Sequence, residues 1–424
     1  MKLEIRNGRV IDPASGFDGA ASVCVESGRI VAVGAPPPGF VADRVVDAAG
    51  CIVCPGLVDV AVRLREPGLE FKATLESELA AAVAGGVTSL ACLPDTDPPL
   101  DEPGLVDMVK HRARVFDRAQ VYPIGALTAG LRGAEITEMG ELAAAGCVAF
   151  SQAEAPLTDT QVLLRALQYA ATFGHRVWLR PQDSYLGRAG VAHDGEVATR
   201  LGLPAIPAAA ETIALGTIFA LIRETGARVH LCRLSSAQGV AMVRAARRDG
   251  LAVTCDVGVH HLHLCDVDIG WFDTQAHLVP PLRGTRDRDA LRAGVADGTI
   301  DVVCSDHTPV DDDGKQLPFG ESEPGATGLE LLLSLTLKWA QEDSVPLAHA
   351  LARVTSAPAS ALGCPGGSLA IGGPADLCVF DPDAHWTVSP ATLSSQGRNT
   401  PFLGLEIPGR VRTTLVGGRV VFEG

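Results

Sequence analysis

Apolar and polar residues alternate in short segments at both ends of the chain. At the start these are LEIRNGRVID, ASVCVESGRIVAVG and DRVVDAAGCIV, and near the end ADLCVFDP and RVRTTLVGGRVVFEG. Alternation with a period of two is typical of strands with one buried face, and the Gly, Pro and Asp residues between the segments indicate turns. We expect residues 1–54 and 371–424 to form one small β-sandwich domain from both termini.

A different pattern fills residues 55–370, where short continuous apolar runs alternate with segments of helical spacing such as TLESELAAAVAGG and TQVLLRALQYAATFGH. The apolar runs are LVDVAVRL, VTSLACLP, AQVYPIGAL, GCVAFSQ, RVWLRPQ, ARVHLCRLS, LAVTCDV and DVVCSDH. Strands that are buried on both faces and separated by helices build a parallel sheet, and eight such units close into a barrel. The sequence therefore predicts an α/β protein with a (β/α)8 TIM barrel.

Composition and charge narrow the classes of function. Hydrophobic residues make up 47% of the chain and charged residues 20%, which supplies a sizeable core. The formal charge of −15 is spread without a basic tract, which argues against nucleic acid or a membrane surface as a partner. The start of the chain alternates like a strand and does not resemble a signal peptide, so we expect a cytoplasmic protein.

The eleven cysteines are best interpreted as buried thiols. Cys51 and Cys54 form a C-x-x-C, but no second cysteine pair or nearby histidine completes a zinc site.

Chemistry in such barrels takes place at the carboxyl ends of the strands. Charged, amide and imidazole side chains stand at these positions: Arg63, Arg65, Asp95, Gln152, Arg180, Gln182, Arg233, His260, His261, Asp306 and His307.

Several blocks, in order along the chain, resemble the dihydroorotases of the amidohydrolase superfamily. They are PGLVDVAVRLREPG, LPDTDP, HLCRLSS, VHHLHLCD, PPLRG, CSDHTP, GATGLE and NTPFLGLEIPGRVRTTLVGG. The resemblance implies a (β/α)8 barrel flanked by a β-sandwich from both chain ends. It also implies hydrolysis or closure of the dihydroorotate ring with zinc that is held by histidines and an aspartate.

This chain differs from that family at the positions of the zinc ligands. The H-x-H positions after the first barrel strand are Ala61 and Arg63, and the histidine positions after strands five and six are Arg180 and Arg233. Only Asp306 matches. A guanidinium has no lone pair to donate to a metal, so we expect no metal, no other cofactor and no catalytic residue, with Asp306 as a remnant.

The group that bridges two metals in the family is an acid or a carboxylated lysine after strand four. Here FSQAE offers Gln152 and Ala153, and none of the five lysines lies near that strand. On the substrate side, Arg65 matches the family arginine that pairs with the substrate carboxylate. Asp95 and Val279 replace family asparagines, which weakens the expectation that dihydroorotate binds.

Two roles remain open for Arg63, Arg180 and Arg233. They could neutralise Asp306, Asp95 and other acids, with Asp306 as the main counter-charge that all three surround, and fill the space of the missing metal. Alternatively, together with Arg65 and Asp95, they could line a pocket that binds an anionic metabolite.

The resemblance favours a non-catalytic dihydroorotase homologue in pyrimidine biosynthesis, acting as a structural or regulatory subunit. Such degenerate members associate in some bacteria with aspartate carbamoyltransferase, which is the partner we expect here beside a second copy in a homodimer. One alternative is an active hydrolase whose relocated metal site uses Asp306 with His260, His261 or His307. The other alternative is a sensor whose arginines bind a carboxylate or a phosphate.

Overall fold

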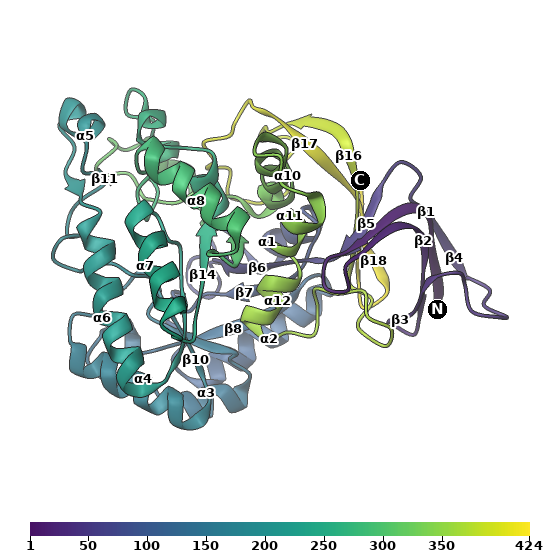
Figure 1. Ribbon diagram of the computed structural model, residues 1–424, viewed down its shortest axis with the longest axis horizontal. Helices are drawn as coiled ribbons and strands as arrows, with labels where there is room; N and C mark the ends of the chain where they lie inside the picture. Colours follow the sequence, from purple (N-terminus) through teal and green to yellow (C-terminus); the bar gives the residue numbers. More distant parts are fainter.

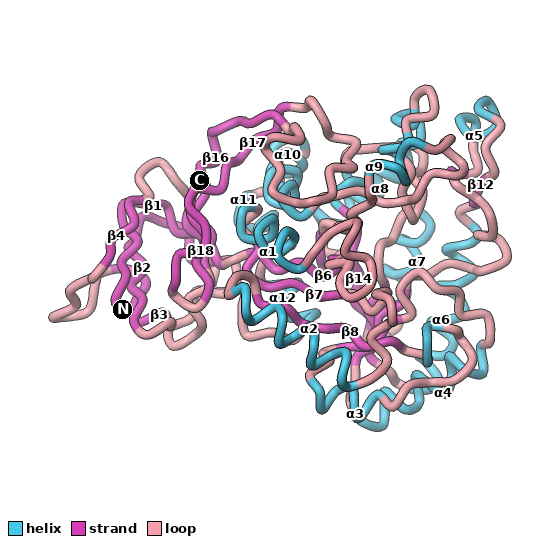
Figure 2. Tube along the Cα trace, turned by 180° about the vertical axis from the view of Figure 1, so that it is seen from behind, coloured by secondary structure: helices cyan, strands magenta, loops and turns pink.

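The computed structural model describes residues 1–424, and the chain forms two parts that lie side by side (Figure 1). A barrel with its helices makes up the larger part, and a sheet that contains both termini makes up the smaller. Figure 2 shows the same division from behind, with strands of the N-terminal and C-terminal segments adjacent in the smaller part.

The terminal sheet has eight strands and is held together by pairing between the two ends of the chain. Its strand order is β18-β17-β16-β5-β1-β2-β3, with β4 also paired to β1. β5 pairs with β16 in antiparallel fashion. Its own core of 14 buried residues is separate from that of the barrel. The strands are β1 (Lys2–Asp12), β2 (Phe17–Glu26), β3 (Arg29–Gly34), β4 (Arg44–Asp47), β5 (Ile52–Pro55), β16 (Leu377–Thr387), β17 (Glu406–Val416) and β18 (Arg419–Glu423).

All eight predicted barrel strands are confirmed. They lie parallel in the order β15-β14-β13-β10-β9-β8-β7-β6, and a bridge between Val62 and His307 joins the first strand to the segment after the last. The strands are β6 (Leu57–Val62), β7 (Val87–Cys92), β8 (Gln120–Ala126), β9 (Ala149–Ser151), β10 (Arg176–Leu179), β13 (Arg228–Leu231), β14 (Val253–Gly258) and β15 (Val302–Cys304). A short pair, β11 (Ala192–His193) and β12 (Ala205–Ile206), lies outside the barrel sheet.

The two segments with helical spacing form helices with defined ends. In α4 the Asp159 carboxylate caps the first turn by accepting from two backbone N–H groups, and Gly174 ends the helix in the left-handed conformation. The helices are α1 (Leu75–Ala84), α2 (Pro103–Phe116), α3 (Met139–Ala145), α4 (Thr160–Phe173), α5 (Glu196–Leu201), α6 (Ala209–Thr225), α7 (Ala237–Arg248), α8 (Thr285–Asp297), α9 (Asp312–Gln316), α10 (Leu332–Glu342), α11 (Leu347–Ala352) and α12 (Ser356–Leu362). Short 3-10 turns lie at Ala129–Leu131, Val259–Leu262, Asp266–Ile269, Thr274–Ala276 and Leu329–Leu331.

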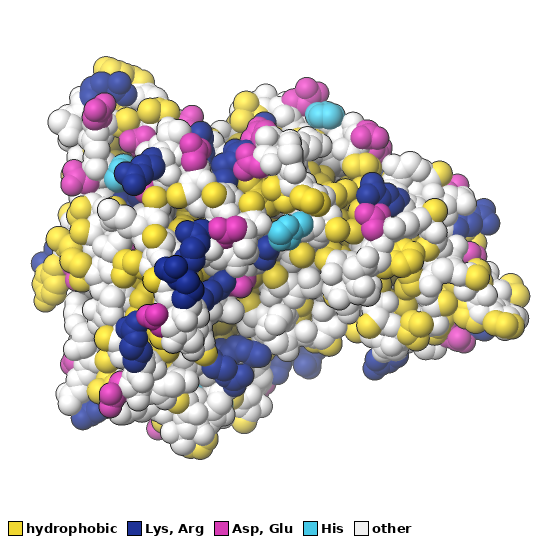
Figure 3. All heavy atoms as spheres, viewed as in Figure 1, with side chains coloured by type: hydrophobic (Ala, Val, Ile, Leu, Met, Phe, Trp, Pro, Cys, Tyr) yellow, Lys and Arg dark blue, Asp and Glu magenta, His cyan; other side chains and the backbone are white.

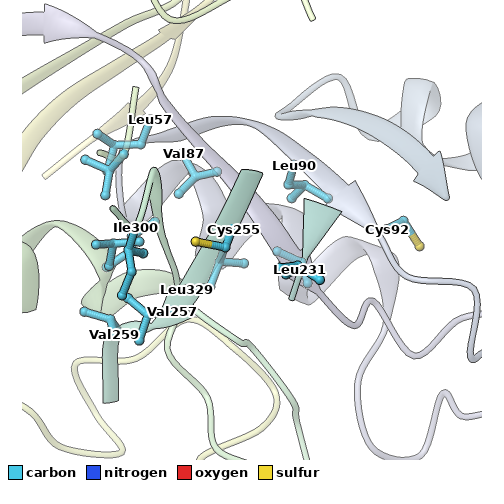
Figure 4. Packing of buried hydrophobic residues seen from close by; sticks show 14 of the residues in the cluster. Leu57, Val87, Leu90, Cys92, Leu231, Cys255, Val257, Val259, Ile300 and Leu329 are labelled. Atoms are coloured by element: carbon cyan, nitrogen blue, oxygen red, sulfur yellow. The ribbon is translucent and has the colours of Figure 1, made fainter. Parts of the chain in front are cut away.

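The main core lies between the barrel strands and the helices around them. Its 68 buried residues include Val257, Val259 and Ile300, which Figure 4 shows close together. A second cluster around the fully buried Trp178 fills part of the barrel interior. Neither cluster contains a charged side chain, so the fold is stabilised by apolar burial that is independent of the polar groups at the strand ends.

No helix of this structure combines the length and the apolar character that crossing a bilayer requires.

Candidate functional site

The carboxyl ends of the barrel strands surround a cavity of about 400 Å³. It brings together every residue proposed from the sequence as ligand-binding, and the remnant aspartate: Arg63, Arg65, Asp95, Arg180, Arg233 and Asp306. Glu154 and Thr308 also line it, and neither was proposed from the sequence. Positive and negative groups both line the cavity, so its chemistry depends on which charges are already paired.

Arg63, directly after β6, is fully engaged with protein groups. Its Nε donates to Asp95 Oδ2 at 2.7 Å, its Nη2 to Glu154 Oε1 at 3.0 Å and its Nη1 to Thr308 Oγ1 at 2.8 Å. Burial alone would lower the pKa of Arg63, but the carboxylates around it raise the pKa above its ordinary value. This guanidinium therefore remains charged and has its donors directed to neighbouring side chains.

Glu154 is the centre of the charge cluster. Its carboxylate forms ion pairs with three guanidiniums, those of Arg63, Arg180 and Arg233. Burial would raise the pKa of Glu154, but the three arginines outweigh it and lower the pKa to about 2. A single carboxylate thus binds three strand ends together, after β6, β10 and β13.

Arg233 and Asp306 form a second, deeper pair. Arg233 Nη1 donates to Asp306 Oδ1 at 3.0 Å, and Arg63 Nη1 lies 3.6 Å from the same oxygen. Both Arg233 and Asp306 have left-handed backbones, with φ of 57° and 49°, a strained conformation that occurs often at functional sites. Burial raises the pKa of Asp306 to about 6, and the two arginines offset it only in part.

A chain of hydrogen bonds supports Arg233 from within the barrel. Its backbone N–H donates to Asp256 Oδ1 at 2.6 Å, and Asp256 Oδ2 lies 2.9 Å from His230 Nε2. His230 Nδ1 lies 2.8 Å from Thr254 Oγ1. His230, Cys232 and Asp256 place possible metal ligands within 4.8 Å of one another, yet both nitrogens of His230 already have partners in this chain. His230 is thus a buried structural residue.

The expectation that Asp306 is the main counter-charge of all three arginines is wrong. Arg180 makes its ion pair with Glu154 and its Nη1 donates to Gln182, and it has no ion pair with Asp306. The segment FSQAE, which offers no metal bridge at the matched position, contributes Glu154 to the charge cluster instead.

Backbone conformation explains why Glu154 was missed. Ala153 has φ of 49°, so the chain turns after β9 and brings Glu154 into the cluster. Gln152 instead bonds Thr128 Oγ1 and the Leu131 carbonyl. The only signal in the sequence is a glutamate two positions beyond the matched one, which a position-by-position match overlooks.

The residues at the expected zinc positions do not fit zinc. Ala61 offers no ligand atom, and Arg63, Arg180 and Arg233 present cations that repel a metal ion. Asp306 is left as the one suitable ligand among them, and it already pairs with Arg233 and Arg63.

The histidines of the relocated metal site do not converge on Asp306. Burial lowers the pKa of His260 to about 3 and that of His261 to about 4, so both rings are neutral. His261 Nε2 lies 3.0 Å from the Pro280 carbonyl, and His307 bonds Glu78. The single group of three close potential ligands in the structure does not include Asp306.

Arg65 differs from the other arginines of the cavity because no carboxylate pairs with it. It is 9% exposed, and its Nε donates to the Pro309 carbonyl at 2.9 Å. Burial lowers the pKa of Arg65 to about 10, and the nearby Arg63 adds to the effect. Within this cavity Arg65 is the guanidinium that retains capacity for an anion.

Comparisons with known proteins agree with the resemblance seen in the sequence. Residues 50–239 match the dihydro-orotase-like family and residues 189–422 the amidohydrolase family. The chain is 45% identical to the dihydroorotase-like protein of Pseudomonas aeruginosa over 424 residues, which is 100% of both chains. It is 41% identical over 423 residues to a dihydroorotase of Syntrophotalea carbinolica, covering 100% of this chain and 99% of that one.

Solved structures support the fold. The L-hydantoinase (dihydropyrimidinase) from Arthrobacter aurescens superposes with a TM-score of 0.89 at 23% identity, over 99% of this chain and 96% of that chain. A D-hydantoinase (dihydropyrimidinase) from Thermus sp. gives a TM-score of 0.83 at 22% identity, over 99% and 95%. At these identities the likeness concerns the fold alone.

The central position of Glu154 predicts the effect of Glu154→Gln. The amide removes the charge that three guanidiniums share, and we expect a loss of about 2 kcal/mol in unfolding free energy at neutral pH, measured by urea denaturation. Phosphate added at fixed ionic strength should restore part of the loss because an anion can replace the carboxylate. The matched control is Glu323→Gln, which removes an acid paired only with Lys72. Equal losses in the two variants would contradict a central role for Glu154.

The raised pKa of Asp306 predicts a dependence of stability on pH. The folded state retains the Asp306 proton up to a pKa of about 6, whereas the ordinary value is 3.8. Unfolding free energy should therefore fall as pH rises from about 4 to 6, by an amount on the order of 3 kcal/mol from this group. Asp306→Asn should flatten the slope in that window, and an unchanged slope would argue against burial of an ionisable Asp306.

Proposed function

Because this chain belongs to the dihydroorotase-like family of the amidohydrolase superfamily, we propose that it is a member without hydrolytic activity that acts as a structural or regulatory subunit. One observation carries the proposal. A network of arginines and carboxylates, centred on Glu154, takes the place where the family resemblance implies zinc.

The proposal follows from what hydrolysis of a cyclic amide needs. A bound metal supplies an activated water at neutral pH and polarises the ring carbonyl. The side chains at this barrel mouth do not fit such an ion. The guanidiniums of Arg63, Arg180 and Arg233, which could polarise a carbonyl, are paired with Glu154. The arginines donate hydrogen bonds to acids, and Asp306 accepts them. Asp306 therefore has no metal-bound water from which to remove a proton.

The proposed partner is the catalytic chain of aspartate carbamoyltransferase, in pyrimidine biosynthesis. Its support is the family resemblance, in which degenerate members assemble with that enzyme. A barrel that keeps its fold but lacks the metal ligands can still act through its surface, by binding another protein. The same reasoning includes a second copy of the chain in a homodimer.

A second role is favoured by Arg65, which is buried at the cavity and lacks a carboxylate partner. We propose that the cavity also accepts a small carboxylate or phosphate at this guanidinium. Thermal stabilisation of the wild-type chain by phosphate that is absent in Arg65→Gln would support this role.

For the purified protein we expect less than about 0.1 zinc per chain by elemental analysis and no turnover of dihydroorotate or carbamoyl aspartate, since several donors are needed at once to hold the ion. The measurement should follow expression in zinc-supplemented medium. About one zinc per chain together with chelator-sensitive turnover would refute the proposal.

For the partnership, the chain and the aspartate carbamoyltransferase catalytic chain of the same organism should elute together in size-exclusion chromatography. The variant Asp306→Asn should support assembly and carbamoyltransferase activity as the wild type does, because the role does not use the remnant site. Separate elution at micromolar concentrations of both chains, or loss of assembly in this variant while it remains folded, would contradict the proposed role.

A further inference from the structure

A second cavity lies at the opposite end of the barrel. It has a volume of about 440 Å³ and is formed by the amino-terminal parts of β10, β13 and β14 together with α12. The barrel mouth uses the carboxyl ends of the same strands, so the two cavities share no lining residue. A cavity of this size is sufficient for a small metabolite.

The floor of this cavity is polar although it belongs to the barrel interior. Val253 and Cys255 face the helices around the barrel, so the alternation of β14 turns Thr254 inward. Thr254 is nevertheless exposed, in a strand that has β13 and β15 on either side. Barrel interiors are ordinarily filled by layers of side chains, so an exposed inward threonine marks a missing part of one layer.

Two arginines flank the cavity without a carboxylate partner. Arg228 donates to the Gly174 carbonyl at 2.5 Å, and Arg176 Nη1 lies 3.5 Å from the Leu362 carbonyl. Neither takes part in an ion pair, in a chain whose formal charge is −15. On the face seen in Figure 3, lysine and arginine side chains lie over α7 and near β10, with some acidic side chains among them. The edge of the cavity therefore attracts anions.

The walls are mostly apolar, and the small residues of α12 leave the space open. The apolar lining residues include Trp178, Leu251, Ala357 and Ala361. The acid that lines the cavity, Asp301, is already paired with Arg247. The ring of Trp178 is fully buried and its Nε1–H has no hydrogen-bond partner, so a donor without an acceptor stands beside the cavity. An occupant with an apolar body would suit these walls.

We propose that this end of the barrel is a binding site for a small organic anion with an apolar body, of the monocarboxylate class. The carboxylate pairs with Arg228 and Arg176 at the edge, and the apolar body packs between Trp178 and the alanines of α12. The site is separate from the barrel mouth and does not depend on the proposed function.

Isothermal titration calorimetry with benzoate tests the site in the full-length protein. We expect saturable binding of one benzoate per chain, weakened roughly tenfold by Arg228→Gln. Ala361→Phe fills the space and should abolish binding, while Arg248→Gln, which removes an exposed arginine that does not line the cavity, should change it less than about twofold.

Two further measurements distinguish binding at this site from binding to the arginines at the barrel mouth. Inorganic phosphate, which lacks an apolar body, should not displace benzoate, and Arg65→Gln should leave benzoate binding unchanged. Absence of saturable benzoate binding would overturn the proposal. So would wild-type affinity in Ala361→Phe, or loss of binding in Arg65→Gln.

Discussion

The Glu154 carboxylate, shared by three guanidiniums, is the interaction on which the barrel mouth depends. Without it, Arg180 would lose its one ion-pair partner beside two further guanidiniums, those of Arg63 and Arg233. With it, the three strand ends are tied to one another by charge-assisted hydrogen bonds. The cluster links the strand ends as a metal ion does in a metalloenzyme, but it supplies no activated water.

The separation between fold and site explains how the fold would tolerate the proposed replacement of a metal centre. The core between strands and helices and the cluster around Trp178 consist of apolar side chains, and the terminal sheet has its own core. None of these depends on the charges at the strand ends. Substitutions at the mouth can therefore change the chemistry while the architecture is kept, and a hydantoinase of 23% identity superposes over 99% of this chain.

The sequence predicted the fold almost completely because its signals are local. Eight apolar runs, helical spacing between them and alternation at both ends correspond to the eight barrel strands, the helices and the terminal sheet.

The site was predicted less well. The positions of Arg63, Arg65, Arg233 and Asp306 around one cavity follow from strand ends, which meet at one edge of a barrel. The pairing of charges could not be predicted in this way. It depends on the left-handed backbone of Ala153, which brings Glu154 into the cluster, and no local sequence pattern indicates that turn. The exposure of Thr254 at the opposite end of the barrel could not be predicted from the sequence either, because a gap in a packed layer arises from residues far apart in the sequence.

The central claim is that arginine–carboxylate pairs have replaced the metal centre. Its most direct test is anomalous diffraction at the zinc absorption edge from crystals grown with excess zinc. The account predicts no anomalous peak within the barrel mouth and density for the Glu154 carboxylate between the guanidiniums of Arg63, Arg180 and Arg233. An anomalous peak within about 2.3 Å of a carboxylate oxygen of Asp306 or Glu154, with the arginines turned away, would contradict it.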